Sequence, residues 1–390
     1  MTDVDVVIVG AGAAGIGAGL ALRQAGLSCI ILEAASRVGG RAFTDTHSLP
    51  SSWDHGCHWM HCADVNPLVP WADRVGARYL RQVRPDHSMY WSDGGWLDTA
   101  AARQANTVTG EAFGAVYAAA AQGDDVAISD VLPDAGRWAR GVRHILQLMT
   151  SEDPEYVSAE AYADYEDTDV NWPVISGYGD LITRLASGLP VRLGVAVESV
   201  EEESGGVRVR SAQGEIRAGA AIVTTSTNVL NAGGIRFGSG PARDLLEKIA
   251  EVPCGAYEKV AIALRRPVIG EADSLFCMID PGDGASPANF QVHGPERRVL
   301  IAHLGGSLAR EIARGGPQAM RDYALARLSL AFGADVLSEV EATATTDWLD
   351  NPWVRGAYSY ARPGHATTRR EMIAAETGPI AFAGEAFSMR

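Results

Sequence analysis

Short apolar stretches separated by glycine-rich turns open the chain. Residues 5–9 (Asp-Val-Val-Ile-Val) form a β-branched run, which is typical of a strand buried on both faces of a parallel sheet. A helical pattern then runs to Gln24 and stops before Gly26, a residue type that commonly ends helices. A second apolar run, residues 28–32, ends just before Glu33. The pattern predicts a strand–helix–strand unit of an α/β domain.

The turn between the first strand and the helix has the pattern Gly-x-Gly-x-x-Gly. Its candidate pyrophosphate-binding residues are Gly10, Gly12, Ala14 and Gly15. Such glycines allow a tight turn, a close backbone approach to the phosphates, and close packing of helix on strand. The N–H groups of the helix N-terminus would face the phosphates. Glu33 can accept hydrogen bonds from a ribose diol and would repel a 2′-phosphate, which predicts FAD or NAD rather than NADP.

A second glycine pair separates FAD from NAD. Residues 37–41 read Arg-Val-Gly-Gly-Arg, so that Arg37, Gly40 and Arg41 lie near the same phosphates, where guanidinium groups bind well. Here the chain resembles the flavin-containing amine oxidase superfamily, which includes monoamine oxidases, polyamine oxidases, L-amino-acid oxidases and related desaturases. The resemblance implies that Arg41 lies on the pyrophosphate of FAD.

Residues 55–62 contain three histidines and two cysteines. Zinc sites usually pair their ligands in two spaced clusters, and no second cluster follows, so we expect no metal site. The stretch resembles one in polyamine oxidases that is often followed by Asn-Pro, here Asn66-Pro67. The resemblance implies that four residues run along the flavin ring, namely Gly56, Cys57, His58 and Trp59. It also implies that His61 faces the substrate. A hydrogen-bonded structural histidine is the alternative for His61.

The chain has only two lysines, Lys248 and Lys259. Lys259 interrupts an apolar strand, and burying an ammonium group is costly unless a partner is present, so a functional lysine is favoured. Pro253-x-Gly255-x-x-x-Lys259 resembles the amine oxidase segment whose lysine reaches flavin N5 through a water. Tyr257 points to the same face of the strand. The alternative is a lysine on an edge strand that extends to solvent.

The last segment also resembles the superfamily. Trp348 and Gly356-x-Tyr358, with Pro363-Gly364 after them, resemble its Trp…Gly-x-Tyr/Phe…Pro-x-Gly passage. By the resemblance, Trp348 contacts the cofactor and Tyr358 faces the reacting centre. Gly384 and Glu385 correspond to the last nucleotide-domain strand, with the glutamate near the FAD ribityl chain. Val197, on a predicted strand, corresponds to a valine whose backbone pairs with adenine.

Other patterns outline the rest of the chain. Asp93-Gly94 predicts a hairpin within residues 90–96. Helices are expected at four places: residues 111–122, 137–149, 242–250 and 318–331. In the second of these helices an apolar stripe is expected to be core: Trp138, Val142, Ile145 and Met149.

The predicted fold is α/β, a Rossmann-like FAD-binding domain interleaved with a mixed sheet-and-helix substrate domain. The FAD-binding domain is expected to comprise residues 1–67, 177–235 and 344–390. The substrate domain is expected to comprise residues 68–176 and 236–343.

Composition narrows the class of protein. The chain of 390 residues is 47% hydrophobic and 21% charged, as in ordinary soluble proteins. A net charge of −15 argues against nucleic acid as a partner and would weakly attract cationic amines. The five cysteines show no spacing typical of a disulfide framework, and the first strand leaves no room for a signal peptide. No apolar run reaches the length of about 20 residues that a membrane span needs. We therefore expect a cytoplasmic protein without a membrane anchor. The oligomeric state stays open, and a homodimer is one alternative.

The resemblance implies FAD-dependent oxidation of an amine. A hydride passes from the carbon next to nitrogen to flavin N5, the imine hydrolyses, and O2 reoxidises the flavin to give H2O2. His61, Tyr257 and Lys259 favour a polyamine or secondary amine substrate. One alternative is a desaturase or dehydrogenase of the same fold that uses another acceptor, against which Lys259 argues. The other alternative is a flavin-binding scaffold protein that catalyses no reaction.

Two departures from the family pattern add expectations. Monoamine oxidases attach FAD through a cysteine directly before the cage tyrosine, and that position is Ala357, so we expect non-covalent FAD. The chain stops at Arg390, whereas relatives continue into a helix whose N-terminus faces the flavin pyrimidine. We therefore expect a longer native polypeptide or poor retention of FAD.

Overall fold

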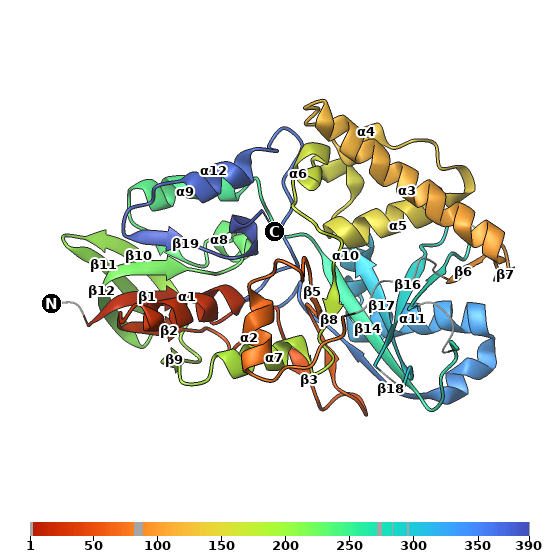
Figure 1. Ribbon diagram of the computed structural model, residues 1–390, viewed down its shortest axis with the longest axis horizontal. Coiled ribbons are helices and arrows are strands. Elements are labelled where there is room, and N and C mark those ends of the chain that lie inside the picture. The colour runs from red at the N-terminus through yellow and green to blue at the C-terminus, as the bar shows by residue number, and fades with distance from the viewer. Residues whose placement is uncertain (1–2, 82–88, 271–274, 283, 295, 390) are drawn as a thin grey trace.

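The computed structural model describes residues 3–81, 89–270, 275–282, 284–294 and 296–389. Two sheets lie side by side in it, with helices above their junction and on their outer faces (Figure 1). This mixed α/β architecture, with a Rossmann-like first sheet, confirms the predicted fold class. The expectation about the chain end at Arg390 lies outside the described residues. None of the described helices has the length and apolar character that a membrane span requires.

The first sheet has eight strands in the order β13-β10-β11-β12-β1-β2-β9, with β19 also paired to β12. Its strands are β1 (Val4–Val9), β2 (Cys29–Leu32), β9 (Val191–Arg192), β10 (Val197–Glu203), β11 (Gly206–Ser211), β12 (Gly214–Val223), β13 (Arg236–Phe237) and β19 (Ile380–Phe382). The pairs β1–β2, β1–β12, β2–β9 and β12–β19 are parallel, while β10–β11 and β11–β12 are antiparallel.

Both faces of β1 are buried, as its continuous apolar run predicts. Val7 and Val9 belong to a core cluster that includes side chains of α9 (Pro241–Ile249) and α12 (Thr368–Ala374). Val6 and Ile8 face the opposite side, where they pack with residues of α1 (Ala13–Gln24). The small helices α7 (Tyr178–Leu185) and α8 (Thr227–Asn231) complete this half.

The second sheet has seven strands in the order β18-β14-β17-β16-β15-β6-β7. Its strands are β6 (Met89–Ser92), β7 (Gly95–Trp96), β14 (Tyr257–Leu264), β15 (Phe276–Ile279), β16 (Ala288–His293), β17 (Val299–Gly305) and β18 (Val340–Thr345). Helices α10 (Gly306–Arg314) and α11 (Gly316–Phe332) cover its outer face over an apolar cluster. The edge-strand alternative for Lys259 is wrong, because β14 lies between β18 and β17.

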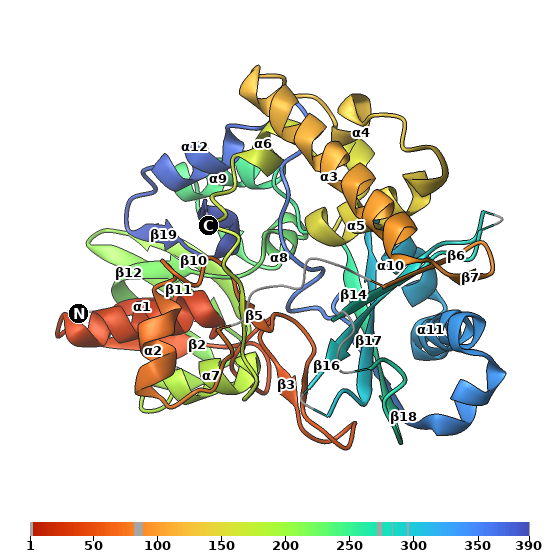
Figure 2. The same ribbon diagram turned by 45° about the vertical axis from the view of Figure 1, so that its right-hand side comes forward.

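The remaining helices form a layer above the junction of the sheets, best seen in Figure 2. They are α3 (Thr99–Ala121), α4 (Ile128–Val131), α5 (Ala139–Thr150) and α6 (Ala159–Ala163), and α2 (Leu68–Arg74) lies beside the first sheet. The short pairs β3 (Thr44–Asp45) with β4 (Trp53–Asp54) and β5 (Trp59–Met60) with β8 (Trp172–Pro173) order the connecting loops. The 3₁₀ turns are η1 (Gly136–Trp138), η2 (Pro154–Tyr156), η3 (Ala334–Glu339) and η4 (Glu385–Phe387).

Several local predictions can be compared with these elements. The hairpin is confirmed as β6–β7, with Asp93 and Gly94 at φ values of 52° and 82°. The helix expected from residue 111 begins earlier, at Thr99, where the Asp98 side chain caps it by accepting from Ala101 N at 2.8 Å. The core assignment of Met149 is wrong, because the end of α5 borders a cavity and leaves this residue 46% exposed.

The strands of the first sheet come from residues 4–32, 191–237 and 380–382, and those of the second from residues 89–96 and 257–345. The chain therefore passes between the two sheets several times. The exact domain boundaries stay predictions.

Candidate active site

A cavity of about 1020 Å³ extends from the first sheet to the second. Ligand-binding cavities in proteins are typically about 300–1,000 Å³, so this one lies at the upper end of that range. Its walls come from the carboxyl ends of β1, β2 and β12, from the loop after β4, from α5, and from the cavity-facing side of β14 to β17. In an open α/β sheet the carboxyl ends of the strands are where ligands usually bind.

The glycine turn after β1 forms one end of the cavity. Gly10 has φ +105°, and Gly12 is the N-cap of α1 without any side-chain capping hydrogen bond. A Cβ atom on Gly15 would lie 1.9 Å from the carbonyl oxygen of Gly10, so only glycine permits this packing of helix on strand. Gly40, at φ +56°, packs against Gly12 from the second glycine pair. The uncapped helix N-terminus and the glycine cradle fit a pyrophosphate group.

Glu33 is buried beside this cradle. One carboxylate oxygen accepts from Ala11 N at 2.7 Å and the other from Ala35 N at 2.8 Å. A carboxylate has about four lone-pair positions, so Glu33 can still accept from a ribose diol. The backbone contacts hold the carboxylate in a fixed orientation toward the cavity.

The two arginines of the second glycine motif have different partners. The Arg37 guanidinium lies 4.3 Å above the ring of Phe43. Arg41 forms an ion pair with Glu385 at 2.9 Å and also contacts the carbonyl oxygen of Ala357. Burial lowers the pKa of Arg41, but the charge and hydrogen bond of Glu385 and the nearby thiols of Cys254 and Cys57 together outweigh it, and the net shift is upward. The Ser359 hydroxyl also donates to Glu385, at 2.8 Å. The geometry therefore joins Arg41 and Glu385, which the sequence places 344 positions apart.

The segment after β4 lies directly against Arg41. A Cβ atom on Gly56 would lie 1.7 Å from the Arg41 carbonyl oxygen, so glycine is required here. Cys57 is exposed to the cavity, and Trp59 is buried at its edge. The indole N–H of Trp348 donates to the carbonyl of His55 at 3.1 Å and fixes the start of the segment.

The histidines and cysteines of this stretch diverge. His58 Nε2 contacts Gln291 at 2.8 Å, His61 Nδ1 contacts Asn171 at 2.5 Å, and Cys62 donates to the Glu166 carbonyl at 3.2 Å. Across the described residues, no three His, Cys, Asp or Glu side chains are grouped to hold a metal ion. His61 is both hydrogen-bonded and exposed at the cavity wall, so the geometry is compatible with either interpretation of this residue.

Lys259 is 5% exposed. Its ammonium group donates to the carbonyl oxygens of Asp54, at 3.2 Å, and of Gly56. Burial lowers its pKa to about 8, although the carboxylate of Asp54 opposes the shift. Asp54 is itself buried, where it accepts from the backbone N–H groups of Tyr178 and Gly179 and from the Thr44 hydroxyl. No local sequence pattern indicates a role for Asp54, since its electrostatic role depends on the position of Lys259, 205 residues away.

Tyr257 and Tyr358 face one another in the cavity. Their ring centroids lie 6.0 Å apart at an interplanar angle of 48°. Tyr358 is 36% exposed, and its hydroxyl donates to the Leu148 carbonyl in α5. The two rings form an open aromatic pair with space beside it for a small apolar group.

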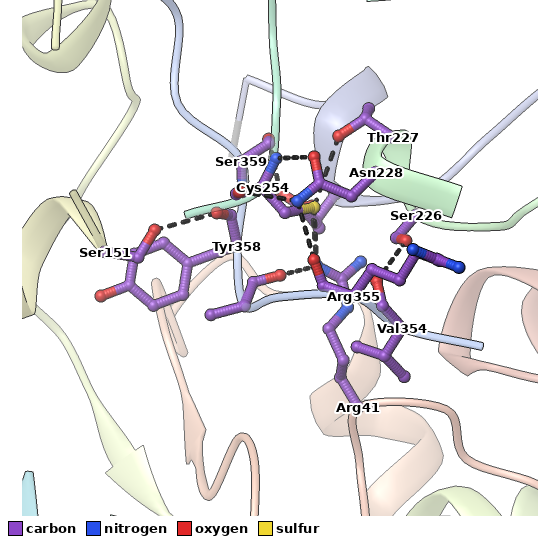
Figure 3. A network of polar contacts seen from close by, with 12 residues as sticks. Arg41, Ser151, Ser226, Thr227, Asn228, Cys254, Val354, Arg355, Tyr358 and Ser359 are labelled. Carbon is purple, nitrogen blue, oxygen red and sulfur yellow. Dashed lines mark hydrogen bonds and ion pairs between the residues drawn. The ribbon is translucent and has the colours of Figure 1, made fainter. Parts of the chain in front are cut away.

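Polar contacts hold the segment that carries Tyr358 (Figure 3). The Asn228 amide donates to the carbonyls of Cys254 and Arg355, and its oxygen accepts from Cys254 N at 2.9 Å. The Ser226 hydroxyl donates to the Val354 carbonyl at 2.6 Å, and the Ser151 hydroxyl to that of Tyr358 at 3.0 Å. Residues 354–359 are thus attached to α8, to Cys254 in the segment before β14, and to the end of α5.

Comparison with known proteins assigns the family. Residues 138–390 match the model of the flavin containing amine oxidoreductases, and residues 8–74 match that of the NAD(P)-binding Rossmann-like domains. The chain belongs to the flavin-containing amine oxidoreductase family. It is accordingly a flavin-dependent amine oxidoreductase, as the resemblance predicts.

Individual relatives match this amine oxidoreductase over nearly its whole chain, and the solved structures among them share its fold. Polyamine oxidase 2 of Arabidopsis thaliana is 25% identical over 98% of this chain and 83% of its own. The structure of cyclohexylamine oxidase from Brevibacterium oxydans superposes with a TM-score of 0.82 at 22% identity, covering 100% of this chain and 94% of that one. A putrescine oxidase solved with putrescine gives a TM-score of 0.80 at 22% identity, covering 99% and 94%.

The fold brings almost all predicted site residues of the amine oxidoreductase to one cavity. Every one except Gly15 lines it, including Ala14, Val197, Trp348 and Gly384. Gly15 lies behind the turn, against Gly10. Whether each residue contacts cofactor or substrate stays a prediction.

Sequence reasoning missed one group of cavity residues. Asn289 and Gln291 on β16 and His303 on β17 line the cavity next to Lys259. Polar residues at 289, 291 and 293 alternate within an otherwise apolar stretch, and a period of two places them on one face of a strand. That alternation was the available signal.

Proposed function

We propose that this amine oxidoreductase binds FAD and oxidises an amine with O2 as the electron acceptor. The observation that carries the proposal is the buried ammonium of Lys259, bonded to the carbonyls of Asp54 and Gly56 within the cavity. The aromatic pair Tyr257–Tyr358 borders the same cavity. In this arrangement a cation lies beside the segment assigned to the flavin ring. The aromatic pair offers an apolar surface for the substrate in the same cavity.

The residues present fit a bound FAD. The glycine cradle and the α1 N-terminus suit its pyrophosphate, Glu33 suits the ribose, and the segment from Gly56 to Trp59 offers a wall for the ring. When bound there, FAD would supply the two-electron oxidation of the carbon next to the amine nitrogen, with O2 as the electron acceptor and H2O2 as its product.

The chain's own residues position the substrate. Tyr257 and Tyr358 hold the alkyl part of the amine beside their rings and exclude water there. Burial keeps the pKa of Tyr257 above its ordinary value, so its hydroxyl stays neutral. Lys259 supplies a positive charge where negative charge develops during electron transfer to O2. His61, at the wall, is proposed to contact the substrate.

An amine substrate is also supported by the names of the relatives, which include polyamine, putrescine and cyclohexylamine oxidases. The preference for a polyamine or secondary amine is part of the proposal. The experiment is a screen of amines and amino acids in air by a coupled assay for H2O2. The same compounds are also mixed with the enzyme without oxygen, and bleaching of the flavin absorbance is measured. Bleaching of the flavin with H2O2 release in air supports the proposal. Bleaching without H2O2 contradicts O2 as acceptor, and no bleaching by any amine contradicts amine oxidation.

We further propose that FAD is held non-covalently. Ala357, before the cage tyrosine, offers no thiol, and Cys254 is buried beside Arg41 and Thr227. Acid precipitation of the protein is expected to leave the yellow colour in the supernatant. Colour that stays with the pellet after washing in denaturant contradicts this prediction and would direct attention to Cys57, which is open to the cavity.

A further inference from the structure

Side chains from separate parts of the sequence form a hydrogen-bond chain along the wall of the cavity. They are Tyr257 on β14, Gln291 on β16, His303 on β17 and His58 in the segment after β4. The hydroxyl of Tyr257 contacts His303 Nδ1 at 2.9 Å, and His303 Nε2 contacts Gln291 Oε1 at 3.2 Å. The amide nitrogen of Gln291 contacts His58 Nε2 at 2.8 Å. The hydrogen-bond chain therefore runs from the aromatic pair to the segment assigned to the flavin ring.

Both histidines of the hydrogen-bond chain are neutral. Burial, and after it the charge of Lys259, keeps the pKa of His58 and of His303 well below the ordinary value. A neutral imidazole carries one proton on its two ring nitrogens, so one nitrogen donates and the other accepts. Which nitrogen carries the proton depends on what the neighbouring side chain offers to each of them.

Gln291 decides where both protons lie, because its amide offers an oxygen on one side and N–H groups on the other. The oxygen can only accept, so His303 carries its proton on Nε2 and receives the hydrogen bond of the Tyr257 hydroxyl on Nδ1. On the other side the amide N–H donates to His58 Nε2, which leaves the proton of that ring on Nδ1. The two histidines thus hold opposite tautomers on the two sides of one amide.

A half-turn of the amide would reverse both tautomers, and the reversed arrangement is the poorer one. His303 Nδ1 would then donate to the oxygen of Tyr257. The proton of that hydroxyl would lose its acceptor, since His303 is its hydrogen-bond partner among the described residues. Gln291 itself is only 4% exposed. The observed orientation gives every donor between Tyr257 and His58 a matching acceptor.

We propose that Gln291 is a positioning residue for amine oxidation. Its amide fixes opposite tautomers in His303 and His58 and, through His303, anchors the hydroxyl of Tyr257. The ring of Tyr257 is thereby kept 6.0 Å from the ring of Tyr358, beside the substrate space. The proposal rests on the proposed amine oxidation and extends it, because Gln291 acts on the substrate through Tyr257 and does not touch it.

The nitrogen NMR shifts of the imidazole rings, recorded on holoenzyme with isotope-labelled histidine, test the tautomers. The signals are assigned by replacing each histidine in turn with glutamine. The parent is expected to show Nε2–H for His303 and Nδ1–H for His58. His293 is the internal control: it is two residues from Gln291 on β16, and its Nε2 donates to the Ser52 carbonyl at 3.1 Å, so it is Nε2–H in every variant. Equal tautomers in His303 and His58 of the parent, or the reverse assignment, overturn the proposal.

Gln291→Met keeps the length of the side chain and removes both its donor and its acceptor. Without the amide N–H, His58 is expected to change from Nδ1–H to Nε2–H, the more stable tautomer of a free imidazole, while His293 stays the same. A His58 that keeps Nδ1–H in this variant contradicts the role of Gln291. The parent spectrum decides the tautomers even where the variant does not fold.

Turnover of pentylamine, measured by H2O2 release, tests the effect on the substrate. Gln291→Met is expected to lower kcat by about tenfold and to change KM less, because the ring of Tyr257 keeps its apolar area but loses its fixed orientation. In the Tyr257→Phe background the hydrogen-bond chain no longer reaches the ring, so the same substitution is expected to change kcat by roughly twofold or less. Equal effects of Gln291→Met in both backgrounds overturn the positioning role.

The two proposals fail separately. A parent that holds the opposite tautomers but oxidises no amine supports the hydrogen-bond chain and contradicts the proposed oxidase function. A parent that oxidises amines but holds the same tautomer in His58 and His303 does the reverse.

Discussion

Replacing Lys259 with methionine is expected to slow the reaction of the reduced enzyme with O2 by about 10²-fold. The buried ammonium is held by two backbone carbonyls in the segment assigned to the flavin ring, where it can stabilise the negative charge that forms when an electron passes to O2. Electrostatic stabilisation of this kind is typically worth about 3 kcal/mol. Stopped-flow mixing of reduced enzyme with O2 isolates this step, and flavin absorbance measures cofactor content separately.

The pH dependence gives an independent measure of the same group. With its pKa lowered to about 8 by burial, Lys259 loses its charge as the pH rises through 8. The reoxidation rate of the parent enzyme is expected to fall over that range, while the methionine variant stays level. An unfolded chain keeps this lysine protonated up to about 10.5, so the unfolded state binds more protons between pH 8 and 10.5. Across that window the contribution of Lys259 to the free energy of unfolding rises with pH.

Lys248 is the matched control, because it is the other lysine of the chain. It lies on α9, has a side chain 45% exposed and pairs with Glu371 at the surface. Such surface ion pairs contribute little to the stability of a protein, and Lys248 lies away from the cavity. Lys248→Met is therefore expected to leave the reoxidation rate and the flavin content unchanged. If Lys259→Met reoxidises as fast as the parent, the assignment of Lys259 is wrong, and a dehydrogenase that uses another acceptor is favoured.

Replacing Gly15 with alanine is expected to destabilise the protein by about 3 kcal/mol and to remove most of the bound flavin. The added Cβ atom would lie 1.9 Å from the carbonyl oxygen of Gly10 and 3.1 Å from the Thr224 hydroxyl. The backbone at Gly10 and at Thr224 cannot move away easily, because Gly10 follows β1, which is paired on both sides, and Thr224 follows β12, one of its two partners. Overpacking of this kind costs up to about 3 kcal/mol of stability. Moving α1 away also displaces the phosphate cradle. Urea unfolding and flavin content after purification measure the two effects.

Gly17, two positions further along α1, is the matched control. It is exposed, and nothing lies within 4 Å of a Cβ atom built on it. Because alanine is the better helix former, Gly17→Ala is expected to stabilise the protein by roughly 0.5–1 kcal/mol and to keep the flavin. Full flavin content and unchanged unfolding in Gly15→Ala would show that the helix can shift, and that the third glycine is not required for packing.

Local patterns predicted those parts of the site whose binding residues all lie within one short continuous segment. The glycine turn, α1 and Glu33 lie within about thirty residues, and strand, helix and carboxylate are read directly from apolar runs and residue types. Lys259 was identifiable because an ammonium in an apolar strand is unusual wherever the strand lies. The same reasoning failed for Met149, whose stripe resembled a core face although the end of α5 borders the cavity.

The tertiary structure decided which distant residues share a surface. His58, Tyr257, Gln291 and His303 form one hydrogen-bond chain only because β14, β16 and β17 pair in a particular register and the segment after β4 lies against them. A shift of one residue in that register would turn Asn289 and His303 into the apolar core. The pairing of Arg41 with Glu385 likewise depends on how the chain returns to the first sheet. By itself the sequence predicted a glycine turn suited to a dinucleotide and a lysine within an apolar strand, whereas the polar wall of the cavity depends on strand pairing, which no local pattern encodes.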